Sequence, residues 1–390
     1  MMPGILIGGK DASGKKVDIA YIDYGSVITQ TGGLADVKIT QMIPRAYSDG
    51  MFGYDFARVN PECLGVGIDA PAIQRTWENL EKQGFPLDEL ITGLVLLDII
   101  QILRGIPAST PGYVHRFYST TPSFSPLVEM VGYIGEIWTY PPEYHIGLDN
   151  RLGELRKNLK GIFRSNNLGK ASQVDYLKAV NQAGISILSK ESEFNVVKHL
   201  LGIDFKCEFL KSGTKPTPDL TITKKTGNLS CEVKSRIVEN VFQNIVNEGQ
   251  TRGLIGPDPL SLPPESIFAL LSWATFSTIK RAMDEQKSQI LFCDLSRTFI
   301  GLMFPALESF WKINLNFSEA TEHACTLANN GEQVIIAFVS LPGITHHFKA
   351  TVFKRSDIEP TGKALWDLNK ELSLQSPQLA KFLSEIFKTE

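Results

Sequence analysis

Cysteine is scarce in this sequence, and no two cysteines form a C-x-x-C pair. The five that occur, Cys63, Cys207, Cys231, Cys293 and Cys325, are an odd number. A disulfide framework and a zinc ribbon are therefore not expected, because both need paired thiols at short spacing. Reduced thiols fit better, and we expect a cytoplasmic protein.

Long hydrophobic runs are absent as well. The most apolar stretch, residues 91–103, has 13 residues and contains Asp98. A bilayer span needs about 20 such residues, so we expect a buried helix there and no membrane contact. The opening segment MMPGILIGG lacks the basic region and long apolar run of a signal peptide.

No overall basicity marks the chain as a nucleic-acid binder, although a local basic groove would suffice. The 390 residues carry 39 Lys and Arg against 42 Asp and Glu. Residues 1–150 have a net charge of −7, whereas residues 151–390 have a net charge of +4. This asymmetry predicts two units. We expect residues 1–150 to be an α+β domain of unknown class that acts as a sensor, recognition or partner-binding unit.

Complete motifs for phosphate binding or nucleophilic catalysis are lacking. Residues 9–16, GKDASGKK, approach the P-loop pattern, but Lys16 stands where Ser or Thr would bind magnesium. The next segment is strand-like, so we predict a strand–turn–strand hairpin. No G-x-S-x-G motif occurs, and the adjacent His346 and His347 lack further ligands at metal spacing.

Periodic patterns divide the chain into elements. In the first unit they predict strands at 4–8 and 17–28 and a helix at 87–105, and the prolines of residues 107–147 argue against a long regular helix there. In the second unit they predict helices at 151–170, 190–202, 238–252, 265–286 and 365–387. Predicted strands cover 204–210, 219–223, 229–235, 289–295, 333–341 and 347–353, with a hairpin turn at 225–228.

Two carboxylates and an ammonium converge in this hairpin. Asp219 opens one strand, and Glu232 and Lys234 lie on the next, on one face because strand side chains alternate. The apolar residues between them, Leu229, Cys231 and Val233, predict that the other face packs in a core. Carboxylate oxygens suit Mg²⁺, and a bound metal can activate water against a phosphodiester.

Pro218-Asp219 and Glu232-Val233-Lys234 resemble the PD-(D/E)XK signature of restriction endonucleases and Holliday-junction resolvases. The resemblance implies a restriction-endonuclease-like mixed sheet flanked by helices within residues 151–390. It also implies Mg²⁺ or Mn²⁺ bound by Asp219 and Glu232, with Lys234 serving the attacking water. In that family a preceding helix adds a Glu. The candidates here are Glu193 and Glu191, of which we prefer Glu193. A following helix adds a Gln, here Gln243 or Gln250.

The expected activity is that of an Mg²⁺-dependent endodeoxyribonuclease in restriction, phage defence or mobile-element biology. The alternatives are a repair or recombination nuclease that recognises DNA structure, and a non-catalytic binding relative. Basic residues that we expect near the DNA backbone are the segment 151–170 and Lys211, Lys215, Lys224 and Lys225. A protein partner or a homodimer would use the N-terminal domain. Six aromatic residues form either a recognition surface or a packed shell: Tyr113, Phe117, Tyr118, Trp138, Tyr140 and Tyr144.

Overall fold

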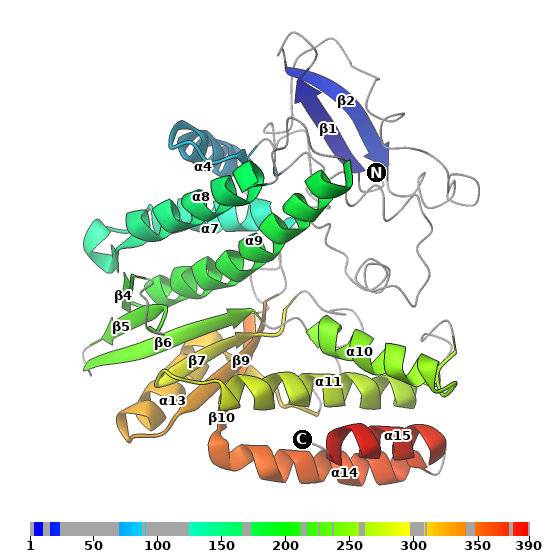
Figure 1. Cartoon of the computed structure of the whole chain (residues 1–390). Helices are drawn as coiled ribbons and strands as arrows, with labels where there is room; N and C mark the ends of the chain where they lie inside the picture. The colour runs from blue at the N-terminus through cyan, green and yellow to red at the C-terminus, as the bar shows by residue number, and fades with distance from the viewer. Residues whose placement is uncertain are drawn as a thin grey trace. The chain divides into compact units, whose positions relative to one another are not determined.

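The structure is a computed structural model of the chain (Figure 1). It describes residues 4–10, 16–23, 70–87, 90, 125–165, 173–211, 217–224, 227–235, 238–256, 262–296, 308, 310–340, 348–373 and 377–388. The helix predicted at 87–105 and the pair His346 and His347 lie outside these residues, apart from residues 87 and 90.

The chain forms two compact units. The first comprises Met1–Ile106, Thr120–Lys215 and Pro342–Thr345, and the second comprises Pro107–Ser119, Pro216–Leu341 and His346–Glu390. One of the boundaries between the two units lies between Lys215 and Pro216. The boundary predicted at residue 150 falls inside helix α8 (Leu148–Ser165).

The first unit begins with a β-hairpin. Strands β1 (Gly4–Lys10) and β2 (Lys16–Asp23) pair antiparallel, with Lys10 opposite Lys16. The strand–turn–strand prediction for the P-loop-like segment is therefore confirmed. Further elements of this unit are α4 (Ala70–Lys82), α7 (Ser125–Ile137), α8, α9 (Gln173–Gly202) and the parallel pair β3 (His145–Ile146) and β4 (Lys206–Phe209). The α+β class expected for residues 1–150 stays a prediction.

Helix α7 corrects the expectation for residues 107–147. A regular helix of 13 residues occurs there, between the two proline-rich stretches. Pro126 is its second residue, in the first turn, where the missing amide hydrogen costs no helical hydrogen bond. The next prolines, Pro141 and Pro142, follow after the helix has ended at Ile137. Prolines therefore bound this helix instead of preventing it.

The second unit is an α/β structure built on a mixed sheet. Among its described residues the strand order is β5-β6-β7-β9-β10-β8. The pairs β6–β7 and β7–β9 are parallel, and β5–β6, β9–β10 and β10–β8 are antiparallel. The bounds are β5 Leu220–Lys224, β6 Gly227–Ser235, β7 Ile290–Asp294, β8 Leu315–Asn316, β9 Val334–Ser340 and β10 Phe348–Lys354. The predicted mixed sheet flanked by helices is confirmed for this unit.

The two central strands are apolar on both faces. All five residues of β7 are buried, as are six of the seven in β9. Such continuous apolar strands are typical of a parallel sheet covered by helices on both sides. Phe292 packs against Phe317 of helix α13 (Phe317–Asn329), with ring centroids 5.9 Å apart. Leu291 and Cys293, on the other face, belong to the core beneath helices α10 (Val238–Thr251) and α11 (Pro264–Asp284).

Four helices share the core on that second face (Figure 1): one contacts β7, two pack against this helix, and the last packs against one of those two. They are α10 (Val238–Thr251), α11 (Pro264–Asp284), α14 (Ile358–Ser373) and α15 (Pro377–Lys388). The periodicity predicted from 365 to 387 thus divides into two helices. Pro377 begins the second, because proline is tolerated only in a first turn. Within the described ranges, none of the helices combines the length and apolar character that a membrane crossing requires.

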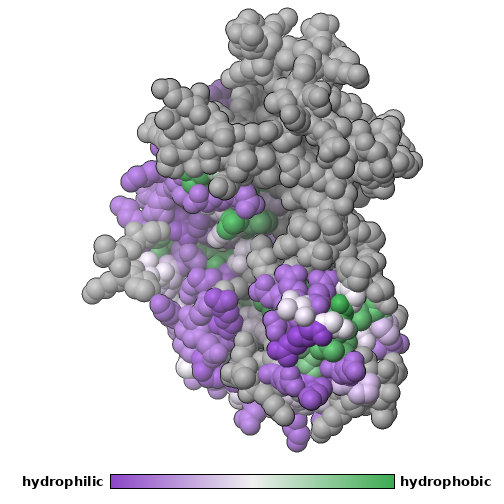
Figure 2. All heavy atoms as spheres, turned by 45° about the vertical axis from the view of Figure 1, so that its right-hand side comes forward, coloured by the Kyte–Doolittle hydropathy of each residue, from purple (hydrophilic) through white to green (hydrophobic). Residues whose placement is uncertain are grey.

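On the face drawn in Figure 2, most of the coloured surface is hydrophilic. Apolar side chains gather there in small groups bordered by hydrophilic residues. Only two large hydrophobic side chains are classed as exposed among the described residues, Ile146 at 51% and Ile185 at 59%. Scattered exposed residues of this kind are normal for a globular surface.

Candidate active site

The hairpin β5–β6 sets the spacing of the two predicted carboxylates. Leu220 lies opposite Cys231, and in an antiparallel pair this register puts Asp219, one residue earlier, opposite Glu232. Lys224 lies opposite Gly227, so the turn is shorter than the predicted 225–228 segment. Gly227 has a φ of 122°, a backbone conformation that favours glycine.

Burial alternates along β6 as the sequence predicts. Leu229, Cys231 and Val233 are buried at 4%, 0% and 6% exposure, whereas Glu232 and Lys234 are only partly buried. The parallel neighbour β7 places Leu291 beside Glu232. Glu232 and Lys234 therefore lie on a face of the sheet that continues, at the neighbouring strand β7, into an apolar core.

Direct interactions fix the orientation of both acids. The Oδ2 atom of Asp219 accepts a hydrogen bond from the amide of Val233 at 3.1 Å. Glu232 forms an ion pair with Lys234 through its Oε1 atom. The side chain of Glu232 is 13% exposed and that of Lys234 is 38% exposed, so both functional groups border solvent. The structure thus joins Glu232 to Lys234 and ties Asp219 to the backbone of the same strand, β6.

Glu193, the predicted third ligand, has other partners. It lies in the buried middle of α9, and both of its oxygens bind Arg151 of α8. Arg151 Nε donates to Oε1 at 2.5 Å and Arg151 Nη2 donates to Oε2 at 3.0 Å. Lys190 also pairs with Oε2. The neighbouring candidate, Glu191, is buried at 2% exposure. We therefore interpret Glu193 as the anchor between two helices of the first unit.

One of the two glutamine candidates, Gln250, forms a hydrogen bond within the second unit. Gln250 donates from Nε2 to the carbonyl of Gly256 at 2.9 Å. This bond fastens the chain that follows α10, so Gln250 has a structural contact of its own. The side chain of Gln243 lies outside the described residues.

The basic residues predicted to contact DNA also have structural partners. Arg156 donates to the carbonyl of Gln83 at 2.6 Å, and Lys224 pairs with Glu322 at 3.5 Å. Lys211 is exposed, and Lys215 and Lys225 lie outside the described residues. Part of the basic charge of α8 therefore joins helices within the first unit. Sequence reasoning missed this role of Arg151, because its acidic partner lies 42 positions away.

Of the six aromatic residues, three lie at positions that the structure describes. Trp138, Tyr140 and Tyr144 are half-buried. The Nζ atom of Lys206 lies 5.1 Å from the ring centre of Tyr144, a distance at which cations and aromatic faces attract. Tyr113, Phe117 and Tyr118 lie outside the described residues.

The donor set of the hairpin suits a hard divalent cation held by few protein ligands. Magnesium is usually bound through one or two carboxylates, with waters and substrate phosphates completing its coordination. Asp219, one residue before β5, and Glu232 of β6 would supply two carboxylates. In the part of the chain that the structure describes, no cluster of three or more His, Cys, Asp and Glu side chains is placed to hold a metal.

Comparisons with protein-family models, with curated proteins and with solved structures found no match to this chain.

Proposed function

We propose that this chain is a metal-dependent nuclease that hydrolyses phosphodiester bonds in DNA. The observation that carries the proposal is the hairpin β5–β6: its register, continued by one residue, puts Asp219, just before β5, opposite Glu232 of β6, which pairs with Lys234. The sequence resemblance to PD-(D/E)XK nucleases supports it. So does the succession of a strand preceded by Asp219, a strand with E-x-K and a helix, in β5, β6 and α10. An endonuclease of restriction, phage defence or mobile-element biology is the setting that this superfamily suggests.

Each residue has a role that its surroundings permit. Asp219 and Glu232 would hold Mg²⁺ or Mn²⁺ from two adjacent strands, and the amide of Val233 keeps Asp219 in place. The bound metal would supply an activated water and neutralise phosphate charge. The Lys234 ammonium, held at Glu232, would orient that water and stabilise the negative charge that develops on the phosphate.

Cleavage assays test this proposal directly. Plasmid, linear duplex, single-stranded DNA and RNA are incubated with Mg²⁺ or Mn²⁺ and the wild-type chain. Near-isosteric variants Asp219→Asn, Glu232→Gln and Lys234→Met run beside it. Each should lower the cleavage rate by about 100-fold or more, because each removes a group that acts on developing charge. Glu332→Gln, at an exposed carboxylate outside the hairpin, is the matched control and should cut like the wild type.

Metal binding provides a readout besides activity. Calorimetric titration with Mn²⁺ should give binding that Asp219→Asn and Glu232→Gln weaken and Glu332→Gln leaves unchanged. Cleavage that persists in all three hairpin variants would place the chemistry elsewhere. Cuts at a fixed sequence would support a restriction-type enzyme, whereas cuts at ends, flaps or junctions would support a repair or recombination nuclease.

A non-catalytic relative of the nuclease fold is the second candidate. The ion pairs of Glu193 favour it, because they engage the carboxylate that the family uses as a further metal ligand. Retained DNA binding without cleavage of any substrate, at any tested metal, would establish this candidate over the enzyme.

A further inference from the structure

A row of polar side chains leads from Glu232 toward the turn of the hairpin. Asn228, Ser230 and Glu232 lie on one face of β6, because side chains alternate along a strand. Leu229 and Cys231, between them, are buried on the other face. Each residue advances a strand by about 3.4 Å, so Ser230 lies about 7 Å and Asn228 about 14 Å from Glu232 along β6. The row therefore begins at the proposed metal site.

The side chain of Asn228 is held by the neighbouring strand β5. Thr223 lies opposite Asn228, and its hydroxyl donates a hydrogen bond to Asn228 Oδ1 at 2.9 Å. Asn228 is exposed, and its Nδ2 group has no hydrogen-bond partner among the residues that the structure describes. Because the oxygen is engaged within the hairpin, this amide offers its two N–H groups to solvent.

Gln289 is held in the same way on the other side of β6. It directly precedes β7, and its Oε1 accepts hydrogen bonds from the backbone amide and the hydroxyl of Ser230, at 3.0 and 3.3 Å. The Ser230 hydroxyl in turn accepts a hydrogen bond from the Gln289 backbone amide at 3.2 Å. Gln289 is exposed, and within the described ranges its Nε2 group has no partner. Its contact with the Ser230 hydroxyl places two further N–H donors on the face of Glu232.

The outward N–H groups of these two amides suit the phosphates of a nucleic acid. Asn and Gln side chains commonly donate to phosphate oxygens, and such contacts fix the position of a strand without reading its sequence. The internal hydrogen bonds orient both amides before binding, which lowers the entropic cost of binding. The other residues of this face between Glu232 and the turn, Thr221, Thr223 and Ser230, carry no charge, so no carboxylate among them repels a phosphate.

We infer that Asn228 and Gln289 form a phosphate-binding strip, over which a strand of DNA runs on its way to the metal site. The inference rests on the proposed nuclease function, because the strip adjoins Glu232. Small phosphate compounds are usually enclosed by a pocket, whereas the strip lies on a partly exposed strand face. One strand of B-DNA rises about 3.4 Å per nucleotide, so about 7–14 Å corresponds to roughly two to four nucleotides from the phosphate that is cut. The strip positions the strand, and hydrolysis stays with the hairpin acids.

Two substitutions remove the outward donors and keep the internal hydrogen bonds. Asn228→Asp and Gln289→Glu retain the oxygen that accepts from Thr223 or Ser230, and each replaces only the outward NH₂ group by a second carboxylate oxygen. Fluorescence anisotropy in a metal-free buffer measures binding of labelled duplex and single-stranded DNA without cleavage. Each variant should bind at least one of these probes about tenfold or more weakly than the wild type, because a carboxylate then lies against a phosphate.

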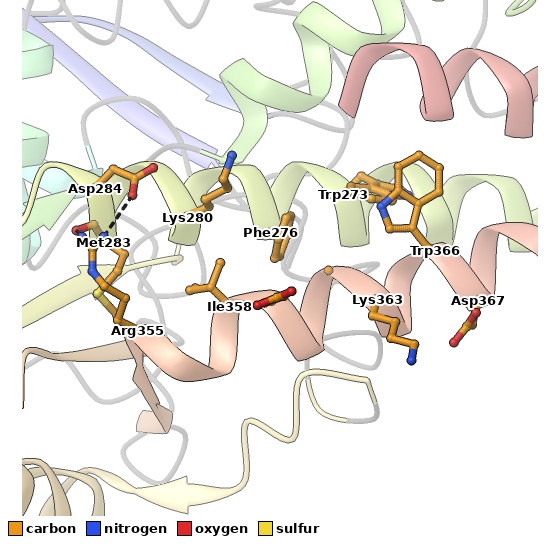
Figure 3. Close-up of a pocket in the computed structure, with 12 residues that line it drawn as sticks. Trp273, Phe276, Lys280, Met283, Asp284, Arg355, Ile358, Lys363, Trp366 and Asp367 are labelled. Carbon is orange, nitrogen blue, oxygen red and sulfur yellow. Dashed lines mark hydrogen bonds and ion pairs between the residues drawn. The ribbon is translucent and has the colours of Figure 1, made fainter. Parts of the chain in front are cut away.

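The controls for added negative charge lie on helices α14 and α15. Helix α14 borders a groove of about 670 Å³ with α11, lined by apolar and charged side chains such as Trp366 and Asp284 (Figure 3). In this view the side chain of Lys363 points away from α11. Lys363→Gln and, at an exposed position of α15, Gln378→Glu lower the net charge by one, as the strip variants do. Both should bind DNA like the wild type.

Modified DNA locates the contacts. When single phosphates are replaced by neutral methylphosphonates, the penalty of Gln289→Glu should shrink at one position and that of Asn228→Asp at another. Two unrelated sequences should bind within about twofold of each other, because phosphate contacts carry no base information. In cleavage assays with Mg²⁺ the strip variants should raise KM and leave kcat within about twofold, the pattern of lost uniform binding.

Strip variants that bind like the wild type, controls that weaken binding equally, or a wild type that binds no DNA overturn the inference. Failure of the nuclease function gives a different result: a wild type that binds DNA through the strip and cuts none leaves the strip standing. Cutting by the wild type together with normal binding and KM in both strip variants has the reverse meaning. Should circular dichroism show that a carboxylate variant is unfolded, the alanine variant replaces it. Binding about threefold weaker is then expected, since a neutral hydrogen bond is lost, and unchanged binding is again contrary.

Discussion

Replacing Glu193 decides whether this residue anchors the fold or serves a metal. The side chains of Arg151 and Glu193 are 5% and 3% exposed, and two hydrogen bonds of 2.5 and 3.0 Å join them. Glu193→Gln keeps the size of the side chain and removes its charge. The guanidinium of Arg151 then keeps its contact with Glu154, at 3.3 Å on the partly exposed side of α8.

The magnitude follows from burial. Removing one partner of a buried ion pair costs about 3–5 kcal/mol, because the other charge stays without water. The loss in Glu193→Gln should lie near the upper end of this range, because both Arg151 and Lys190 lose the carboxylate with which they pair. Arg151→Met should lie near the lower end, since Lys190 still pairs with Glu193. The double variant should cost less than the sum by about 2 kcal/mol or more, which is the coupling of a direct contact.

Urea unfolding measures these free energies, and hydrogen exchange of α8 and α9 assigns the loss to the first unit. Glu154→Gln is the control, with an expected change within about 0.5 kcal/mol, because its side chain is 37% exposed. The loss in Glu193→Gln should be the same with Mn²⁺ or with a chelator. The anchoring role would be refuted by a loss below about 1 kcal/mol or by a loss that appears only with metal. It would also be refuted if the losses of the two single variants simply added up in the double variant.

Three further predictions concern titration, backbone geometry and thiol access. Burial lowers the pKa of His199 to about 3. Between pH 7 and pH 5 this histidine is therefore protonated in the unfolded chain but not in the folded chain. The free energy of unfolding should fall by about 2 kcal/mol over that range. Urea unfolding at both pH values should show a smaller drop in His199→Gln. Gly147 has a φ of 80°, and a Cβ there would lie 2.7 Å from the carbonyl oxygen of Phe209, so Gly147→Ala should cost about 2 kcal/mol or more in thermal unfolding. The four described cysteines are buried, and burial raises the pKa of Cys325 to about 11. In a Cys63→Ser background a thiol reagent at pH 8 should therefore label the native chain slowly and the unfolded chain completely, and fast native labelling would contradict their burial.

Much of the second unit is predictable from sequence, because its patterns are local. The runs that become β7 and β9 are apolar throughout, and the alternation in β6 separates a core face from a polar face. The spacing of Asp219 and Glu232 across a short turn predicts that they face each other, and the neighbouring pair Leu220 and Cys231 has the register that this prediction requires. These features depend on side-chain period and on a hairpin of neighbouring residues, so little tertiary information is needed.

Other features have no local signal. Helix α7 forms between proline-rich stretches because it packs against α4 and α9. A tertiary contact of this kind outweighs the flanking composition.

The sequence by itself determined the apolar strands, the hairpin and the acidic pair that it carries. Only the tertiary structure decided that Glu193 binds Arg151, and that α11 and α14 border a groove lined by apolar and charged side chains. The physical reason is distance along the chain. Periodicity fixes which face of an element is apolar, but the partner of a buried charge is chosen by packing between elements that are remote in sequence.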